Sequence, residues 1–481
     1  MAGLSFELAP ARRSPGGAAG ALIQPRQWQS QLLQLLRARL LRPDAGGHDV
    51  LVHAGPGAGK TLGALLSFQT LAREGRLERL MVFCHRQSIG AQWLAAAARV
   101  GVPLEDWSLQ GLAAGGNLLI SYQAAARHLR RLLADPLQGP WLAVADEVHH
   151  LGLDPQEPEA SAWGHAFTAL SAGASLRLGL SGTPFRADNL AFCAARRIRM
   201  QDGDATVERI VPDLCVEPRR LILAGDVRPL EFRFQDGWVE HGQDGRADRE
   251  TSPLSAETRE SWRARNLRRA IRPGDGGGIA LRLLLQARDR LERVRRDHGR
   301  AAGLVIARDI DHASGLATLL RQEGDRVELV HSQDPDAATR LSGFQASSAD
   351  WLVSIDMAAE GFDAPRIRVV AYLSTVVTRS RFLQAITRAV RMDGERAALE
   401  PVPRQPSYVY APADPLLIAH ARTWSLSEPY LIRARPEGSG DDPGAGTGGP
   451  CPPPLQAMAD DAGEVIRMAG PQLPGFLPRA S

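Results

Sequence analysis

A glycine-rich segment, Ala54–Thr61, lies between an apolar stretch and a helical pattern and ends in a lysine and a threonine. Its central residues are Gly55, Pro56, Gly57, Ala58 and Gly59. Glycines in such a loop let backbone N–H groups close around phosphate oxygens, and the N-terminus of the following helix adds positive potential. The Lys60 ammonium then reaches the β- and γ-phosphates, and the Thr61 hydroxyl coordinates Mg²⁺. The segment predicts a nucleoside-triphosphate site that uses Mg²⁺; the alternative is a glycine-rich turn without a ligand.

Lys60 is the only lysine among the 57 lysine and arginine residues of the chain. Codon bias explains why lysine is missing elsewhere, but it does not explain why one lysine remains at this position. A compact ammonium fits between phosphates in a way that a planar guanidinium does not. The composition therefore supports a phosphate-binding role for Lys60.

Two adjacent carboxylates, Asp146 and Glu147, follow the apolar stretch 141–145. At the end of a strand such a pair can serve two roles in hydrolysis. Asp146 holds Mg²⁺, and Glu147 orients and deprotonates the attacking water. The alternative is an ordinary acidic turn, which the upstream glycine loop makes less favourable. Two histidines, His149 and His150, come next, but adjacent side chains point in different directions and do not suggest a metal pair.

The order of elements that must position these residues is that of an α/β protein. Short apolar stretches at 49–53, 80–84, 118–121, 141–145 and 176–180 alternate with helical patterns, and a second alternating block starts at residue 303. This alternation predicts two domains with parallel sheets covered on both faces. The expected boundaries are 1–20 for a disordered arm, 21–235 for the first domain, 236–300 for an arginine-rich connector, 301–433 for the second domain and 434–481 for a disordered tail open to protein partners.

Composition narrows the classes of protein further. The chain has 481 residues, a formal net charge of +3 and four cysteines without a CxxC pair, which argues against a zinc ribbon and for a reducing cytoplasm. No apolar run reaches the length of a membrane span, and the N-terminus has no apolar segment typical of a secretion signal. We therefore expect a cytoplasmic protein with no membrane partner.

Short motifs along residues 22–425 resemble those of superfamily 2 helicases and occur in the same order. In the first block, the resemblance covers Pro25–Gln29 as the adenine-recognition element, Ala54–Thr61 as motif I, Phe83–Arg86 with Gln92 as motif Ia, Ser121-Tyr122-Gln123, the DExH box Asp146–His149, and Ser181–Pro184 as motif III. In the second block, it covers Ile355–Pro365 as motif V and Gln384–Arg391 as motif VI.

The resemblance implies two tandem RecA-like domains with ATP and Mg²⁺ in the cleft between them. It places Arg26 and Gln29 on the base, Gly361 and Asp363 near the nucleotide, and Lys60, Asp146 and Glu147 in catalysis. It implies nucleic-acid or coupling roles for Arg86, Gln92, Ser121, Tyr122, Gln123, His149, Ser181, Thr183 and Gln384.

Motif VI supplies two arginines, Arg388 and Arg391, whose spacing of three predicts one helix face. In this family such arginines cross the cleft to the γ-phosphate, where an arginine finger is worth about 10³–10⁵ in rate. The alternative is a solvated arginine pair. Thr387 stands where the family usually has glycine.

The partner implied by the resemblance is nucleic acid, with DNA favoured over RNA. The DExH box and the motif III and V sequences look most like the restriction-enzyme and excision-repair branch, whose members track along duplex DNA. Two alternatives stay open: an RNA helicase of the same fold, and a nucleic-acid-binding adaptor with weak ATPase activity. Residues 254–300 hold 13 Arg against 6 Asp and Glu, which indicates either a phosphate track or a solvated helix.

Overall fold

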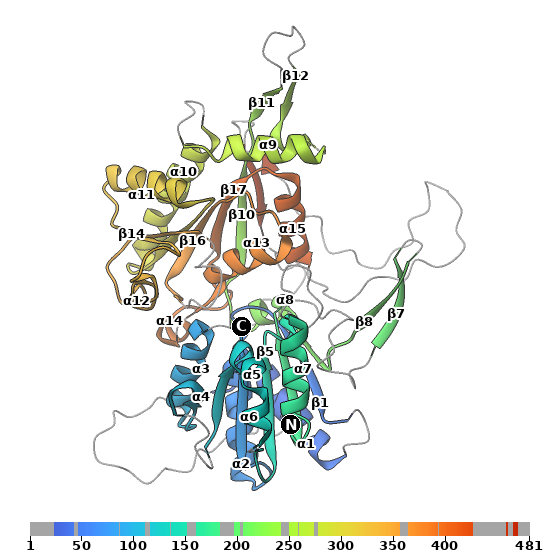
Figure 1. Ribbon diagram of the computed structural model, residues 1–481. Helices are drawn as coiled ribbons and strands as arrows, with labels where there is room; N and C mark the ends of the chain where they lie inside the picture. The colour runs from blue at the N-terminus through green and yellow to red at the C-terminus, as the bar shows by residue number, and fades with distance from the viewer. Residues whose placement is uncertain are drawn as a thin grey trace. The chain divides into compact units, whose positions relative to one another are not determined.

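A computed structural model of the protein describes residues 24–42, 47–85, 87–110, 116–134, 136–151, 160–182, 197–202, 205–241, 250–257, 259–273, 278–355, 364–392, 394–426, 458–459 and 465–469. Contacts between Cα atoms divide the chain into two compact units (Figure 1). The first is built from the described residues of Met1–His53, Gly59–Ser181 and Phe185–Cys215, and the second from those of Ala54–Ala58, Gly182–Pro184 and Val216–Ser481.

The first unit is organised around a seven-stranded sheet with the order β3-β4-β2-β5-β6-β1-β9. Its strands are β1 (Asp49–Ala54), β2 (Arg79–Cys84), β3 (Glu105–Asp106), β4 (Leu118–Ser121), β5 (Trp141–Asp146), β6 (Leu176–Ser181) and β9 (Leu214–Val216). The described pairings from β3 to β1 are all parallel. Every residue of β1 and β5 is buried, as expected for strands covered on both faces. The five strands that the sequence predicts in this unit are confirmed as β1, β2, β4, β5 and β6.

Helices flank this sheet in the order that the periodicity predicts. They are α1 (Gln27–Leu41), α2 (Lys60–Arg73), α3 (Gln87–Val100), α4 (Trp107–Gln110), α5 (Tyr122–Arg127), α6 (Leu129–Ala134) and α7 (Ala160–Leu170). Glycine at position 63 lets α1 approach α2, because a Cβ there would lie 3.0 Å from the Trp28 ring. Of the helices in the described part of the chain, none combines the length and the apolar character that a bilayer span requires.

The second unit contains an eight-stranded sheet with the order β14-β15-β13-β16-β17-β10-β19-β18. Its strands are β10 (Leu230–Gln235), β13 (Ala302–Ala307), β14 (Val327–Val330), β15 (Trp351–Ser354), β16 (Ile367–Leu373), β17 (Ser407–Pro412), β18 (Met458–Ala459) and β19 (Val465–Ala469). Pairings from β14 through to β10 are parallel, whereas β19 runs antiparallel to β10. Two α/β units with parallel sheets are therefore present, as the sequence predicts.

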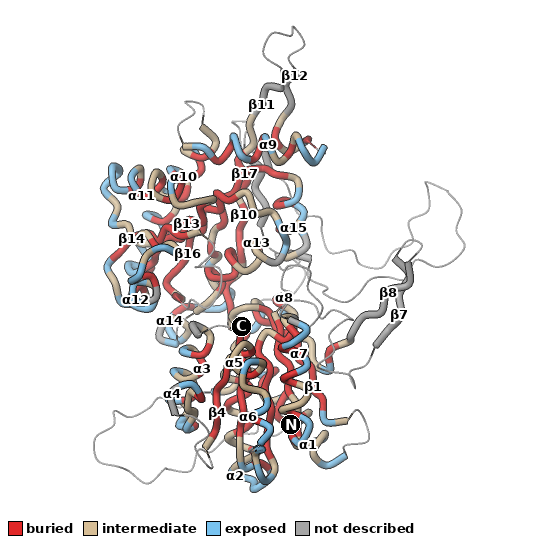
Figure 2. Tube along the Cα trace, viewed as in Figure 1, coloured by how far each residue is buried: buried red, intermediate tan, exposed pale blue. Residues whose placement is uncertain are grey.

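The helices of the second unit enclose a second hydrophobic core, which Figure 2 shows as buried strands beneath partly exposed helices. They are α8 (Pro218–Leu223), α9 (Glu260–Ala270), α10 (Ile279–Asp297), α11 (Ile310–Gln322), α12 (Ala337–Gly343), α13 (Arg379–Ile386), α14 (Gly394–Leu399) and α15 (Pro415–Leu426). Two hairpins pair β7 (Arg197–Asp202) with β8 (Ala205–Ile210), and β11 (Trp238–His241) with β12 (Glu250–Pro253).

The structure differs from the expected connector at 236–300. Strand β10, which we assigned to the first domain, pairs with β17 of the second sheet, because Phe232 and Phe234 of β10 are fully buried there. Helix α10, which we assigned to the connector, buries one apolar face in the second core. The expected connector also holds the β11–β12 hairpin.

The tail also differs in part from the expected disordered segment. Residues Val465–Ala469 form β19, which extends the second sheet next to β10, with Phe234 opposite Ile466. The remaining tail and the residues 1–20 of the expected N-terminal arm lie outside the described residues.

A buried ion pair joins the start of the second unit to its later elements. The guanidinium of Arg228 donates to both carboxylate oxygens of Glu400, at 2.5 and 2.6 Å, and the Arg228 backbone N–H donates to the carbonyl of Val390. Both side chains are almost fully buried. The hydrogen bonds from Arg228 lower the pKa of Glu400 to about 2, against the opposing effect of burial.

We predict that Glu400→Gln destabilises the second unit by about 3–5 kcal/mol, because it leaves the Arg228 charge buried without its counter-ion. Chemical denaturation followed by circular dichroism measures this change. The matched control is Glu292→Gln, since Glu292 is 56% exposed in its pair with Arg288 and such pairs contribute little. Equal stability of the two variants would contradict the prediction.

Candidate active site

The glycine loop has the backbone geometry of a phosphate-binding turn. It follows β1 and ends where α2 begins at Lys60. Gly57 and Gly59 have φ angles of 78° and 83°, in the left-handed region that favours glycine. The Ala58 N–H donates to the Gly55 carbonyl at 3.1 Å and closes the turn. The loop therefore presents the N-terminus of α2, with Thr61 in its first turn, to an anion.

Gln29 connects the start of α1 to this loop. Its side-chain carbonyl accepts from the Arg26 backbone N–H at 2.8 Å, and its side-chain amide donates to the Gly59 carbonyl at 3.0 Å. Gln29 is buried although it is polar, so these bonds satisfy groups that burial would otherwise leave unpaired. The structure thus brings the expected base-recognition residues beside the expected phosphate loop.

Lys60 and Glu147 lie together although 87 residues separate them. The Lys60 Nζ donates to Glu147 Oε1 at 3.0 Å. Among the described residues, Glu147 is the one non-glycine residue with a positive φ, at 50°. This conformation costs of order 1–3 kcal/mol and is typical of functional sites whose surroundings hold the residue in place.

Asp146 is buried beside this pair, and three hydrogen bonds hold it. Its Oδ2 accepts from the Trp93 indole N–H at 2.7 Å, and its Oδ1 accepts from the Glu147 backbone N–H at 3.0 Å. The Tyr122 hydroxyl donates to its backbone carbonyl at 2.8 Å. The carboxylate is therefore held from α3 and from its own turn, and the Asp146 backbone from α5.

The charge state of Asp146 reflects its surroundings. Burial, helped by the nearby Glu147 carboxylate, raises the pKa of Asp146 to about 6, while Lys60 and the bond from Trp93 act against this rise. A buried carboxylate in this state gains from a nearby cation, and together with the Thr61 hydroxyl it supplies the oxygen ligands that Mg²⁺ prefers. The donor set fits a magnesium ion.

Other expected residues of the first unit occupy the same edge of the sheet or its helices. Ser121 caps α5 by accepting from the Ala124 N–H at 3.1 Å, and Ser181 is fully buried at the end of β6. Gln123 on α5 and Gln92 on α3 are half-buried. Arg86, Thr183, Gly361, Asp363 and the side chain of His149 lie outside the described residues.

Motif VI departs from the expected single helix face. Gln384 lies on α13, and Arg388 is buried in the short 3₁₀ helix Thr387–Val390, but Arg391 already has extended backbone with ψ of 149°. The helix ends too early for Arg391 to share a face with Arg388. The Thr387 hydroxyl donates to the Leu383 carbonyl at 2.6 Å, which satisfies its polar group inside the unit.

The sequence did not identify the role of Trp93. A signal existed, because a buried tryptophan nearly always needs a partner for its N–H. The sequence also missed a group of rings in which His85 lies 4.1 Å from His150 and 5.2 Å from Trp163, measured between centroids. These rings connect the end of β2, the 3₁₀ helix Val148–His150 and α7.

Family models match both halves of the chain. Residues 22–186 match the type III restriction enzyme res subunit, and residues 286–393 match the helicase conserved C-terminal domain. The uncharacterized protein Rv2917 of Mycobacterium tuberculosis is 30% identical over 464 residues, which cover 92% of this chain and 71% of that protein. The chain belongs to the superfamily 2 helicase-like proteins.

A second relative of this helicase-like chain is the uncharacterized protein ML1624 of Mycobacterium leprae. It is 31% identical over 365 residues, which cover 73% of this chain and only 58% of that protein. The chain thus spans between about half and three quarters of the length of these relatives.

Solved structures share the fold of this helicase-like chain. A fragment assigned as the HsdR subunit of a type I restriction enzyme from Vibrio vulnificus aligns with a TM-score of 0.50 and 16% identity, covering 85% of this chain and 66% of that one. A variant of Saccharomyces cerevisiae Dbp5, solved with Gle1 and IP6, aligns with a TM-score of 0.51 and 13% identity, covering 84% and 86%. The two units are tandem RecA-like domains.

We predict that Trp93→Phe raises the pKa of Asp146 above its value of about 6, because a hydrogen bond to the charged carboxylate is lost. Carboxyl ¹³C NMR of the metal-free protein follows the titration directly. Trp107→Phe is the control, since the Trp107 indole nitrogen is buried without a hydrogen-bond partner among the described residues. An unchanged titration in the Trp93 variant would show that this bond does not tune the carboxylate.

Proposed function

We propose that this chain is an ATP-dependent motor that moves along nucleic acid, with DNA as its preferred track. The observation that carries the proposal is the contact between Lys60 of the glycine loop and Glu147 of the acidic pair. This contact brings the Lys60 ammonium, which suits phosphates, together with the Glu147 carboxylate, which can activate water. Both residues follow the ends of parallel strands. Fold likeness alone would not support a reaction.

ATP binding changes the partner of Lys60 in this proposal. The ammonium moves from Glu147 to the β- and γ-phosphates, and Gly55–Thr61 close around the phosphate chain. Glu147, released from its ion pair, accepts a proton from the water whose oxygen bonds to the γ-phosphorus, while the bond from the γ-phosphorus to the bridging oxygen of ADP breaks and ADP leaves with that oxygen. Arg26 and Gln29 hold the base.

Thr61 and Asp146 would hold Mg²⁺, which would supply neutralising charge at the phosphates. The bonds from Trp93 and Tyr122 keep Asp146 in one orientation for this task. A rigidly held ligand lowers the cost of organising the site when the nucleotide enters.

The second domain contributes Arg388 and Arg391, with Gly361 and Asp363 near the nucleotide. Domain closure delivers the arginines to the γ-phosphate, so that hydrolysis depends on closure. Coupling to the track uses Arg86, Gln92, Ser121, Tyr122, Gln123, His149, Ser181, Thr183 and Gln384. The match of the first domain to a restriction-enzyme subunit favours DNA.

We predict that ATP turnover rises when duplex DNA is added and rises less with single-stranded DNA or RNA. A phosphate-release assay with each nucleic acid, and with none, measures this. Stimulation by RNA alone would favour an RNA helicase, and no stimulation by any of them would exclude the motor. Lys60→Ala is the control for contaminating ATPases, because it removes the group that binds the phosphates.

We predict that Glu147→Gln binds ATP but hydrolyses it roughly 10²–10⁴-fold more slowly, because the amide cannot accept the proton of water. Equilibrium binding of labelled ATP and single-turnover hydrolysis separate the two effects. Glu292→Gln, at an exposed site on α10, is the matched control. Wild-type turnover in the Glu147 variant would refute its assignment as the base.

A further inference from the structure

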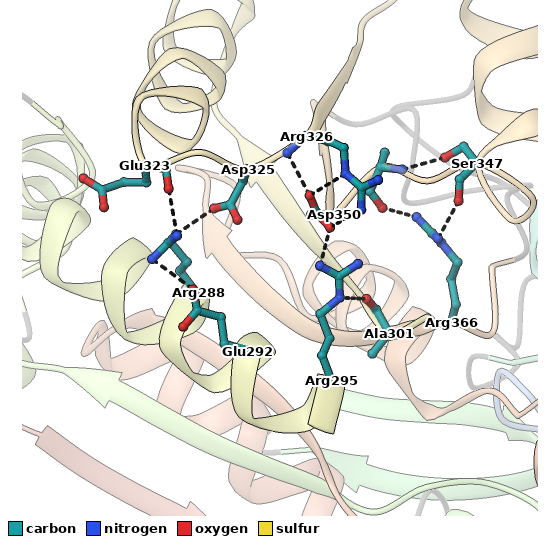
Figure 3. Close-up of polar contacts among 11 residues, drawn as sticks. Arg288, Glu292, Arg295, Ala301, Glu323, Asp325, Arg326, Ser347, Asp350 and Arg366 are labelled. Carbon is teal, nitrogen blue, oxygen red and sulfur yellow. Dashed lines mark hydrogen bonds and ion pairs between the residues drawn. The ribbon is translucent and has the colours of Figure 1, made fainter. Parts of the chain in front are cut away.

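The arginine-rich stretch 254–300 forms two helices whose arginines have different surroundings. On α10 the guanidinium groups of Arg288, Arg293 and Arg295 are engaged in ion pairs. Arg288 pairs with Asp325 at 2.9 Å and with Glu292 at 3.2 Å, and Arg293 pairs with Asp289 at 2.6 Å. Arg295 bonds to Asp350, as Figure 3 shows. Helix α10 therefore uses its arginines for internal ion pairs.

Helix α9 has one buried face and one exposed arginine face. Asn266, Leu267 and Ala270 are buried, and Arg263 on the same side bonds to the buried Asp414 at 2.8 Å. The exposed side carries Arg265, Arg268 and Arg269 on the helix and Arg272 directly after it. Figure 2 shows this alternation of buried and exposed positions along α9.

Three of these exposed arginines have no acidic partner. Within the described segments, no carboxylate lies in ion-pair distance of Arg265, Arg268 or Arg272. Arg265 and Arg268 are three residues apart on α9 and therefore share one face of the helix, while Arg272 lies just beyond the end of the helix. Their charges are therefore not neutralised locally by the described residues.

The acidic and aromatic groups near this face do not cancel its charge. Glu257 is already bonded to Arg259 at 2.9 Å, and Glu260 lies in the first turn of α9, away from Arg268 and Arg272. Trp262 is half-buried, with the Arg259 guanidinium 4.3 Å and the Arg265 guanidinium 5.9 Å from its ring centroid. Such contacts hold a guanidinium in place while its N–H groups remain able to donate.

We propose that the exposed face of α9 binds the phosphodiester backbone of the nucleic acid, as a contact separate from the helicase motifs. The proposal rests on the proposed function for the identity of the partner. Arginine suits this ligand because its planar fork donates two parallel hydrogen bonds to a phosphate. A contact made to backbone phosphates alone positions the nucleic acid and carries no sequence information, so it would hold the track without selecting a sequence.

The test compares two variants that lose the same charge from neighbouring helices. The first is Arg265→Gln with Arg268→Gln and Arg272→Gln, and the control is Arg282→Gln with Arg293→Gln and Arg296→Gln on exposed positions of α10. Fluorescence anisotropy with a labelled DNA duplex is measured for both over a range of salt concentrations. Thermal unfolding verifies that both variants are folded.

We expect the α9 variant to bind about tenfold or more weakly at low salt, and the slope of log K against log salt to fall by about 2–3, because each lost phosphate contact removes about 0.9. The α10 variant should bind like the wild type. ATP turnover without nucleic acid should be unchanged in both, since neither set belongs to the ATP site.

Equal affinities and equal salt slopes for the two variants would overturn the proposal. So would a loss of binding to poly-glutamate with unchanged binding to DNA, because that would identify an acidic protein as the partner. Wild-type protein that binds no nucleic acid under any condition would instead overturn the proposed function itself.

Discussion

The ion pair between Lys60 and Glu147 depends on one constraint, which is that parallel strands end at the same edge of a sheet. Strands β1 and β5 are not neighbours, since β6 lies between them. Because all three run parallel, the loop after β1 and the turn after β5 still face the same space. Ser121 after β4, His85 after β2 and Ser181 at the end of β6 reach this edge for the same reason.

Groups of the same charge, as well as groups of opposite charge, lie close together at this edge of the sheet. Burial raises the pKa of Asp146, and repulsion from the adjacent Glu147 carboxylate raises it further. Lys60 offsets part of the repulsion. The hydrogen bonds from Trp93 and Tyr122 stabilise the buried Asp146 in place of hydrogen bonds from water. The site is thus organised before a nucleotide arrives, at the cost of a left-handed Glu147 and a buried acid. A divalent cation and a triphosphate would complete the charge balance.

In the second unit, arginine fills structural roles that apolar residues often fill. Arg228 with Glu400 and Arg263 with Asp414 are buried pairs: Arg228 precedes β10 and bonds to Glu400 after α14, and Arg263 of α9 bonds to Asp414 just before α15. The Arg228 backbone also bonds to Val390, which fixes the segment that carries Arg388. Arginine therefore forms buried ion pairs inside this unit and, on α9, also provides surface charge. Only the position of acidic partners distinguishes the two uses.

Local patterns in the sequence were enough to predict five strands of the first sheet, the alternating block that begins the second sheet at residue 303, the glycine loop and the acidic pair. Each of these depends on residues that are close in the chain, such as a buried strand and the turn that follows it, and the hydrophobic period reports them directly. The same local view predicted one helix through Arg391, although the chain becomes extended there. It also could not assign Trp93 to Asp146, because 53 residues separate the two side chains.

The arginine-rich stretch 254–300 shows most clearly what the sequence alone could not predict. In sequence, α9 and α10 are both rich in arginine, and both alternatives, a phosphate track and a solvated helix, stayed open. The tertiary structure distinguishes the two helices. The acids that pair with α10 arginines, among them Asp325 and Asp350, lie at the ends of strands that pack near this helix. The sequence by itself determined which residues carry charge and where strands end. Only the fold decided which charges meet, because electrostatic pairing depends on distance in space and not on distance along the chain.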